Sequence, residues 1–305
     1  PNLPLRRFLA NRRKPIWTTI DPTVTKAPPL ASGPPPRLQG MSVLGAHVDA
    51  TDPVAATVEL HGGACQFFLG DPQAWQGPKV EYLGGAAGLR EAAAAAGVAL
   101  YVHAPYVLNL ASTNNRIRIP SRQHLQKQLT AAAEIGAAGV IVHGGHVLAS
   151  DDPQVGFENW RKAIDGLKIE VPLLIENTAG GANAMAKELE RLDQLWDAIS
   201  GSPNADRVGF CLDTCHAHAA GNELSGLVDR VRAITGRIDL VHGNDSRDAF
   251  GSGADRHANL GAGQCDPEGL AEVFATAGAP IILETPGGIP QHLVDMAWIG
   301  AHAAG

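Results

Sequence analysis

The segment VGFCLDTCH (208–216) sets the pattern for most of this chain. Its first five residues form an apolar run, which is typical of a parallel strand that is buried on both faces. The run ends at Asp213, and His216 follows within one helical turn. Packing gives an apolar strand no reason to end on a carboxylate or an imidazole, so we interpret both residues as candidate metal ligands.

Seven further apolar runs of the same kind occur from Met41 onward. They are SVLGAHV (42–48), ACQFFL (64–69), ALYVHA (99–104), GVIVHG (139–144), PLLIEN (172–177), IDLVHG (238–243) and PIILET (280–285). Helical patterns alternate with them at 86–96, 122–135, 157–167, 185–199, 223–234, 267–277 and 291–302. Eight strands that alternate with helices predict an α/β fold, a single (β/α)8 TIM barrel whose strand C-termini converge on one face. An open, doubly wound sheet is the alternative, but it gives no reason for polar strand ends to converge.

Nine residues at or after these strand ends are candidate metal ligands. They are His103, His143, Glu176, Asp213, His216, His242, Asp255, His257 and Glu284. One catalytic metal needs three or four protein ligands, so this set exceeds one ion and suits three if a carboxylate is shared. Imidazoles with carboxylates and no thiolate favour Zn²⁺, with Mn²⁺ or Fe as substitutes. Neighbouring metal ions favour hydrolysis of a phosphodiester.

The bulk composition indicates a globular, acidic protein. Of the 305 residues, 45% are hydrophobic and 18% are charged, and the formal net charge is −7. No apolar run is long enough to span a membrane and no signal peptide is evident, so we expect a cytoplasmic protein without a membrane partner. The acidic charge disfavours broad nucleic-acid binding unless bound cations change it locally. The four cysteines form no C-x-x-C pair, which favours reduced thiols without a functional role.

The first 40 residues differ in composition from the rest. They contain nine prolines, and seven basic residues against a single acid, Asp21. We therefore expect residues 1–40 to form a flexible, Pro-rich basic arm and residues 41–305 to form the catalytic barrel.

Several longer stretches resemble the endonuclease IV family of apurinic/apyrimidinic endonucleases. The matching segments are LGAHV (44–48), FFLGDPQAW (67–75), HAPYVLNLAS (103–112), VIVHGGH (140–146), IENTAGG (175–181), CLDTCHAHAAG (211–221), HGNDSRDAFGSGADRHANLGAG (242–263) and ILET (282–285). The D-T-C-H element with a downstream D-R-H is the most specific of them.

The resemblance implies three Zn²⁺ ions in one site. His103, His143 and Glu176 would hold the first ion. A second would be held by Glu176, Asp213, His242 and Glu284, and the third by His216, Asp255 and His257. Glu176 would bridge two ions, and Glu284 would also steer a proton of the attacking water. The implied reaction is hydrolysis of the phosphodiester 5′ to an abasic site in double-stranded DNA, which leaves a 3′-OH; 3′-blocked ends would be further substrates.

The resemblance also implies contacts with DNA outside the metal site. Arg256 would meet a phosphate, with a salt bridge to a nearby acid as the alternative. Tyr106 and Val107 would enter the minor groove, with rim packing as the alternative. Gln73 lies in a loop where relatives often carry an arginine. We expect a monomer.

The remaining histidines are expected to be structural. We predict that His61, His124, His292 and His302 face solvent, and that His218 is structural. His47 ends the first strand and points toward the site.

The main alternative function is a sugar isomerase or epimerase resembling xylose isomerase. Such enzymes use one metal ion on strand-end Glu, Asp, His and Glu, and Glu176, Asp213, His242 and Glu284 supply that subset. The other five candidate ligands would have no role in a single-metal enzyme.

Overall fold

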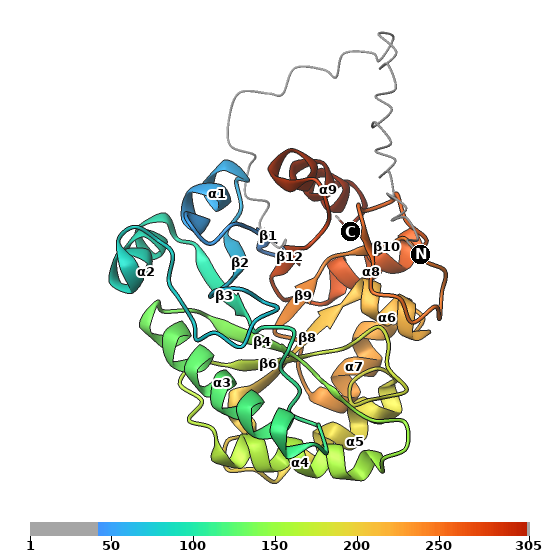
Figure 1. Ribbon diagram of the computed structural model, residues 1–305. Coiled ribbons are helices and arrows are strands. Elements are labelled where there is room, and N and C mark those ends of the chain that lie inside the picture. The colour runs from blue at the N-terminus through green and yellow to red at the C-terminus, as the bar shows by residue number, and fades with distance from the viewer. Residues whose placement is uncertain (1–41, 304–305) are drawn as a thin grey trace, which may run out of the picture. The chain divides into compact units, whose positions relative to one another are not determined.

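The central feature of the fold is a closed barrel of parallel strands (Figure 1). The computed structural model describes residues 42–303. The barrel strands are β1 (Leu44–His47), β2 (Ala64–Phe68), β3 (Ala99–His103), β4 (Gly139–His143), β6 (Leu173–Glu176), β8 (Val208–Asp213), β9 (Leu240–His242) and β12 (Ile281–Leu283). They follow the chain order around the barrel, and β12 closes it against β1 with the register Leu44 to Ile281. The predicted TIM barrel is confirmed.

Helices surround the barrel and connect consecutive strands, except the last helix, α9, which follows β12. They are α1 (Pro53–Glu59), α2 (Gly85–Ala96), α3 (Asn115–Glu134), α4 (Pro153–Gly166), α5 (Leu189–Ser200), α7 (Leu227–Thr235), α8 (Pro267–Thr276) and α9 (Gly288–His302). A short helix, α6 (Thr214–Ala220), continues directly from β8, and a 3₁₀ turn, η1 (Ala205–Arg207), precedes that strand. Among the described residues, none of the helices has the length and hydrophobicity needed to cross a bilayer.

Several predicted helix starts differ from the structure by three to seven residues, and two of these differences have a clear cause. Helix α3 begins at Asn115 rather than Arg122, because the Asn114 side chain accepts a hydrogen bond from the Arg116 N–H and caps the helix ahead of Pro120. Helix α5 begins at Leu189 rather than Met185. The Met185 N–H instead donates to the Gly145 carbonyl, beside the small sheet of β5 (His146–Val147) and β7 (Asn183–Ala184). A second small sheet pairs β10 (Asp245–Ser246) with β11 (His257–Ala258).

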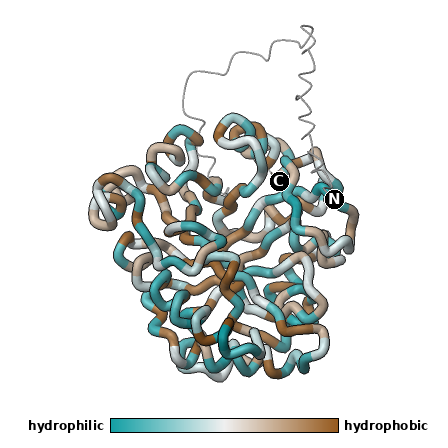
Figure 2. Tube along the Cα trace, in the orientation of Figure 1, coloured by the Kyte–Doolittle hydropathy of each residue, from teal (hydrophilic) through white to brown (hydrophobic). Residues whose placement is uncertain are grey.

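Hydrophobic residues form two core regions. The larger core includes Trp160, Phe157 and Phe210 together with residues of the helices and strands. The smaller core consists of one apolar residue from each of seven strands: Ala64, Tyr101, Ile141, Leu174, Cys211, Leu240 and Ile282. Brown residues in Figure 2 accordingly recur along the central strands. The residues of the smaller core alternate along each strand with residues of the larger one, so we assign them to the barrel interior.

Candidate metal centre

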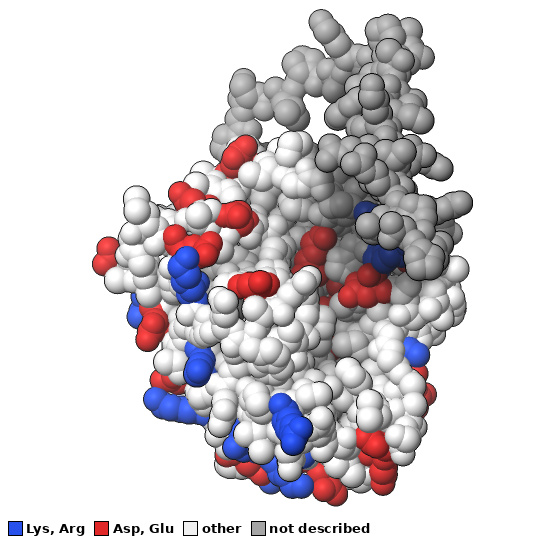
Figure 3. Space-filling model, in the orientation of Figure 1, with Lys and Arg blue, Asp and Glu red and all other residues white. Residues whose placement is uncertain are grey.

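The candidate ligands form the next layer above the apolar barrel interior. Side chains alternate between the two faces of a strand, so the residue two positions after each interior residue also points inward. Those residues are Gln66, His103, His143, Glu176, Asp213, His242 and Glu284, with His47 at the end of β1. The barrel geometry thus brings six of the nine predicted ligands to one place, and Figure 3 shows acidic side chains (red) around the hollow in the middle of this face.

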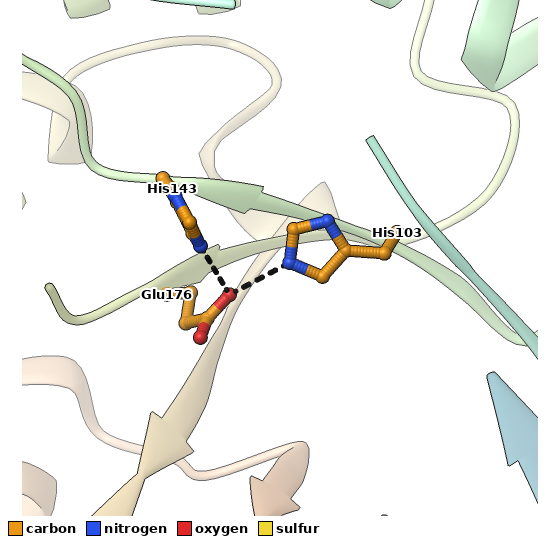
Figure 4. A group of neighbouring side chains, drawn as sticks. All are labelled: His103, His143 and Glu176. Atoms are coloured by element: carbon orange, nitrogen blue, oxygen red, sulfur yellow. Dashed lines mark hydrogen bonds and ion pairs between the residues drawn. The ribbon is translucent and has the colours of Figure 1, made fainter. Parts of the chain in front are cut away.

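His103, His143 and Glu176 form the first group (Figure 4). Glu176 Oε2 lies 3.1 Å from His103 Nε2 and 3.3 Å from His143 Nε2. His103 Nδ1 donates to the Ala104 carbonyl at 2.7 Å, so in the neutral imidazole Nε2 is the nitrogen free to bind a metal ion. Metal-binding histidines are usually held by such a hydrogen bond to the other ring nitrogen.

Glu176, Asp213, His242 and Glu284 form the second group, with ligand atoms all within 4.8 Å of one another. His242 Nδ1 lies 3.1 Å from Glu176 Oε1, 3.3 Å from Glu284 Oε2 and 3.8 Å from Asp213 Oδ2. Glu176 therefore presents one oxygen to the first group and the other to the second. This is the geometry expected of a shared carboxylate.

The third group joins His216 of α6 to Asp255, in the loop between β10 and β11, and to His257 of β11. The Nε2 atoms of His216 and His257 lie 3.1 and 3.2 Å from Asp255 Oδ1. Both nitrogens are buried, yet neither forms a hydrogen bond. Two imidazole nitrogens without partners that converge with one carboxylate oxygen fit a cation between them.

A buried carboxylate, that of Asp245 in β10, holds the segment that follows β11. Asp245 accepts four backbone N–H bonds: Ser246 at 2.7 Å and Cys265 at 2.9 Å on Oδ1, and Gly261 at 3.1 Å and Gly263 at 3.0 Å on Oδ2. A Cβ atom on Gly263 would collide with Asp245 Oδ1, so only glycine allows this approach.

Nearby imidazoles lower the pKa of Glu284 and Glu176 despite burial, whereas burial dominates at Asp213 and raises its pKa. Burial acts to raise the pKa of Glu284, but His242 and His257 outweigh it and lower that pKa to about 2. The same competition holds the pKa of Glu176 well below its usual range. Burial opposes the charged form of His216, yet Asp213 and Asp255 raise its pKa well above the ordinary value. A cluster of this kind binds either protons or metal cations.

Two asparagines that were not predicted as site residues orient these ligands. Asn244 Nδ2 donates to Asp213 Oδ2 at 2.7 Å and to Glu284 Oε2 at 3.2 Å, and its Oδ1 accepts from the Glu284 N–H. Asn177 exchanges two hydrogen bonds with the Asp213 backbone. Their positions, one residue after Glu176 and two after His242, are the sequence signal that could have found them.

Comparison with known proteins adds independent information. A family model described as a xylose isomerase-like TIM barrel matches residues 54–301. The protein named "Probable endonuclease 4" from Mycobacterium tuberculosis (strain ATCC 25177 / H37Ra) is 55% identical over 243 residues, which cover 80% of this chain and 92% of that relative. The protein of the same name from Mycobacterium leprae (strain Br4923) is 52% identical with the same coverage.

The chain belongs to the endonuclease IV family. This endonuclease IV family member matches the crystal structure of endonuclease IV from Thermus thermophilus with a TM-score of 0.73 at 29% sequence identity. The match covers 85% of this chain and 98% of the Thermus chain. A D-tagatose 3-epimerase-like protein gives a TM-score of 0.69 at 19% identity, which shows a shared fold alone.

The candidate DNA-contacting residues of this endonuclease IV family member lie at the rim of the barrel. Tyr106 is 51% exposed and stacks on His143 with ring centroids 5.6 Å apart, and Val107 beside it is half-buried. The Tyr106 N–H donates to the Pro72 carbonyl, so the loop bearing the exposed Gln73 lies against the Tyr106 loop.

Arg256 forms the salt bridge that the sequence analysis gave as its alternative role. Its Nε donates to Asp248 Oδ2 at 2.8 Å, while 64% of the Arg256 side chain stays exposed. The guanidinium therefore remains open to a further anionic partner.

The prediction for the other histidines is partly wrong. His61 and His302 are exposed as expected, but His124 and His292 are buried. His292 Nε2 donates to the Thr285 carbonyl at 2.9 Å, and His124 is 3.3 Å from Gln128 Nε2. His218 is buried as well, and its Nε2 is hydrogen-bonded to the Asp248 carbonyl, which is a structural role.

The four cysteines are free and buried, as expected of reduced thiols. Cys215 lies near Asp213 and His257, but burial raises the pKa of its thiol to about 12. A protonated thiol is a poor ligand beside these imidazoles and carboxylates.

Proposed function

We propose that this chain hydrolyses the phosphodiester on the 5′ side of an abasic site in double-stranded DNA, leaving a 3′-OH, with three Zn²⁺ ions bound by its nine candidate ligands. As a member of the endonuclease IV family the chain is a metal-dependent endonuclease, and the proposal concerns its substrate, its ions and its residues. The observation that carries it is the convergence of the ligand atoms in three groups, two of which share Glu176.

The donor set of each group fits zinc. The first group offers two imidazoles and a carboxylate, the second an imidazole and three carboxylates, and the third two imidazoles and a carboxylate. Bound ions would stabilise charge that develops on the phosphate and lower the pKa of a water molecule. They would also neutralise a rim that is otherwise acidic and would repel a DNA backbone.

Glu284 is the proposed proton acceptor for the attacking water. Its carboxylate is ionised, because its pKa is lowered to about 2, and its two oxygens are oriented by Gln66 and Asn244. Tyr106, Val107, Gln73 and Arg256 are the proposed DNA contacts, and 3′-blocked ends are proposed as further substrates.

The sugar-isomerase alternative has less support. The second group alone would satisfy a single-metal isomerase, but that function leaves the cluster of His216, Asp255 and His257 without a role. The epimerase-like structures share only the fold, whereas the named endonuclease relatives are more than half identical over most of the chain.

The decisive experiment is a cleavage assay on a duplex with one abasic-site analogue. The same duplex with an intact base, and a reaction with chelator, serve as controls. We expect a single nick 5′ to the analogue, a 3′-OH product, and no nick in either control. Protein that contains about three zinc ions per chain and does not nick this duplex would refute the proposal, and one ion per chain would favour the isomerase. Sedimentation of the same preparation tests the expected monomer.

A further inference from the structure

Gln66 occupies a position in the ligand layer although it is neither an imidazole nor a carboxylate. It follows Ala64 of the barrel interior by two residues on β2, and its side chain is fully buried. All of its polar groups are used: Nε2 donates to Glu284 Oε1 at 2.7 Å and to His47 Nδ1 at 3.0 Å, and Oε1 accepts from His242 Nε2 at 2.8 Å.

The neighbours of Gln66 fix the direction of its amide. An ionised carboxylate can only accept hydrogen bonds, so the amide nitrogen must face Glu284. The amide oxygen then faces His242 Nε2, which must carry a proton. In the neutral imidazole that binds a metal, the lone pair of His242 is thereby placed on Nδ1, the nitrogen that faces Glu176, Asp213 and Glu284.

Three other histidines of the centre obtain this alignment from the backbone. His103 donates to the Ala104 carbonyl, His216 to the Asn177 carbonyl and His257 to the Glu284 carbonyl. Each of these four imidazoles has one ring nitrogen that faces away from its ligand group. Only in His242 is that nitrogen hydrogen-bonded to a side chain. Its alignment therefore depends on a group that a single substitution can remove.

We infer that Gln66 is a positioning residue that sets the protonated nitrogen of His242 and holds the Glu284 carboxylate for the cation of the second group. The inference rests on the metal centre of the proposed function. Loss of hydrogen bonds that hold metal ligands typically weakens metal binding by about 10–100-fold. We expect that loss at the second group, with the first and third groups less affected.

The test uses three variants of the full chain. Gln66→Met keeps the length of the side chain and removes both hydrogen-bonding functions. Gln66→Glu keeps an acceptor for His242 and removes the N–H donor to Glu284. Gln128→Met is the matched control, because Gln128 is also fully buried but lies on α3.

Two measurements distinguish positioning from simple stabilisation. Zinc competition against a chelator should show one ion bound about 10–100-fold more weakly in Gln66→Met and in Gln66→Glu, and wild-type binding in Gln128→Met. Histidine ¹⁵N NMR of the zinc-free protein, at a pH where His242 is neutral, should show His242 protonated at Nε2 in the wild type and in Gln66→Glu. In Gln66→Met that signal should be lost or mixed.

The outcomes separate this inference from the proposed function. A wild-type chain that binds no zinc refutes the metal centre itself. If the wild type binds three ions and Gln66→Met holds them equally tightly, the positioning role is wrong. A loss of the Nε2-protonated form of His242 in Gln66→Glu also overturns it, because that variant retains the acceptor.

Discussion

Replacing Asp245 by asparagine should have two effects. It should lower the stability of the chain, and it should prevent the third group of ligands from binding its ion. The carboxylate accepts two backbone N–H bonds on each oxygen and is 1% exposed. An asparagine in either orientation turns its NH₂ toward two N–H donors. Two hydrogen bonds to a charged acceptor are lost, so we expect the free energy of unfolding to fall by about 3–5 kcal/mol.

Urea denaturation of chelator-treated protein measures this change without a contribution from metal. Domains of this kind have a free energy of unfolding of about 5–15 kcal/mol, so Asp245→Asn should still fold at low temperature. The exposed Asp193→Asn is the matched control and should stay within about 0.5 kcal/mol of the wild type. After zinc loading, Asp245→Asn should lack the ion of the group that contains His216, Asp255 and His257.

The reasoning fails if Asp245→Asn unfolds within about 0.5 kcal/mol of the wild type, because four buried donors would then tolerate an amide. It also fails in part if the variant is destabilised but keeps three ions. In that case the loop after β10 is held in place by contacts other than Asp245.

Three further predictions concern the centre itself. Glu284→Gln should lower kcat for abasic-duplex nicking by about 10²–10⁴-fold, with little change in lesion binding measured by gel shift. The exposed Glu190→Gln is the control and should not change kcat. Retained activity in Glu284→Gln would exclude Glu284 as the proton acceptor. Burial opposes charging of His257, but Asp255 and Asp213 raise its pKa to about 9. In the chelator-treated protein this stabilisation should be complete below pH 6.5 and be lost, up to about 3 kcal/mol, as the pH rises through 9. Zinc uptake, which needs the neutral imidazole, should strengthen over the same range in calorimetry, and a flat profile would contradict the assignment. Finally, zinc at 1,000 times its Kd should raise the unfolding free energy by about 4 kcal/mol over the chelated protein, and equal melting temperatures would argue against a bound ion.

The barrel and the positions of its ligands could be predicted from sequence because both follow from short-range patterns. Strand-end residues such as His103, Glu176 and Asp213 come together only because parallel strands in a barrel share one carboxyl face. Local apolar periodicity is sufficient to place such residues there, and no knowledge of the loops is needed.

Features that depend on tertiary partners could not be predicted in the same way. The burial of His292 depends on the Thr285 carbonyl, which lies at the end of a different element. The capping contact of Asn114 and the backbone pairing of Met185 with Gly145 decide two helix starts, and neither leaves a periodic signal. Gln66 was missed for a related reason, because an amide within an apolar strand shows its role only when its three partners are known.

The shared Glu176 has a consequence for how the centre would assemble. One oxygen faces His103 and His143, and the other faces His242 and His216. An ion that binds on either side would fix the Glu176 carboxylate that the next ion needs. The first ion therefore bears the entropic cost of ordering this side chain, and the second ion does not. We therefore expect the occupancies of the two sides to be linked thermodynamically, with steep zinc loading curves and few partly filled molecules.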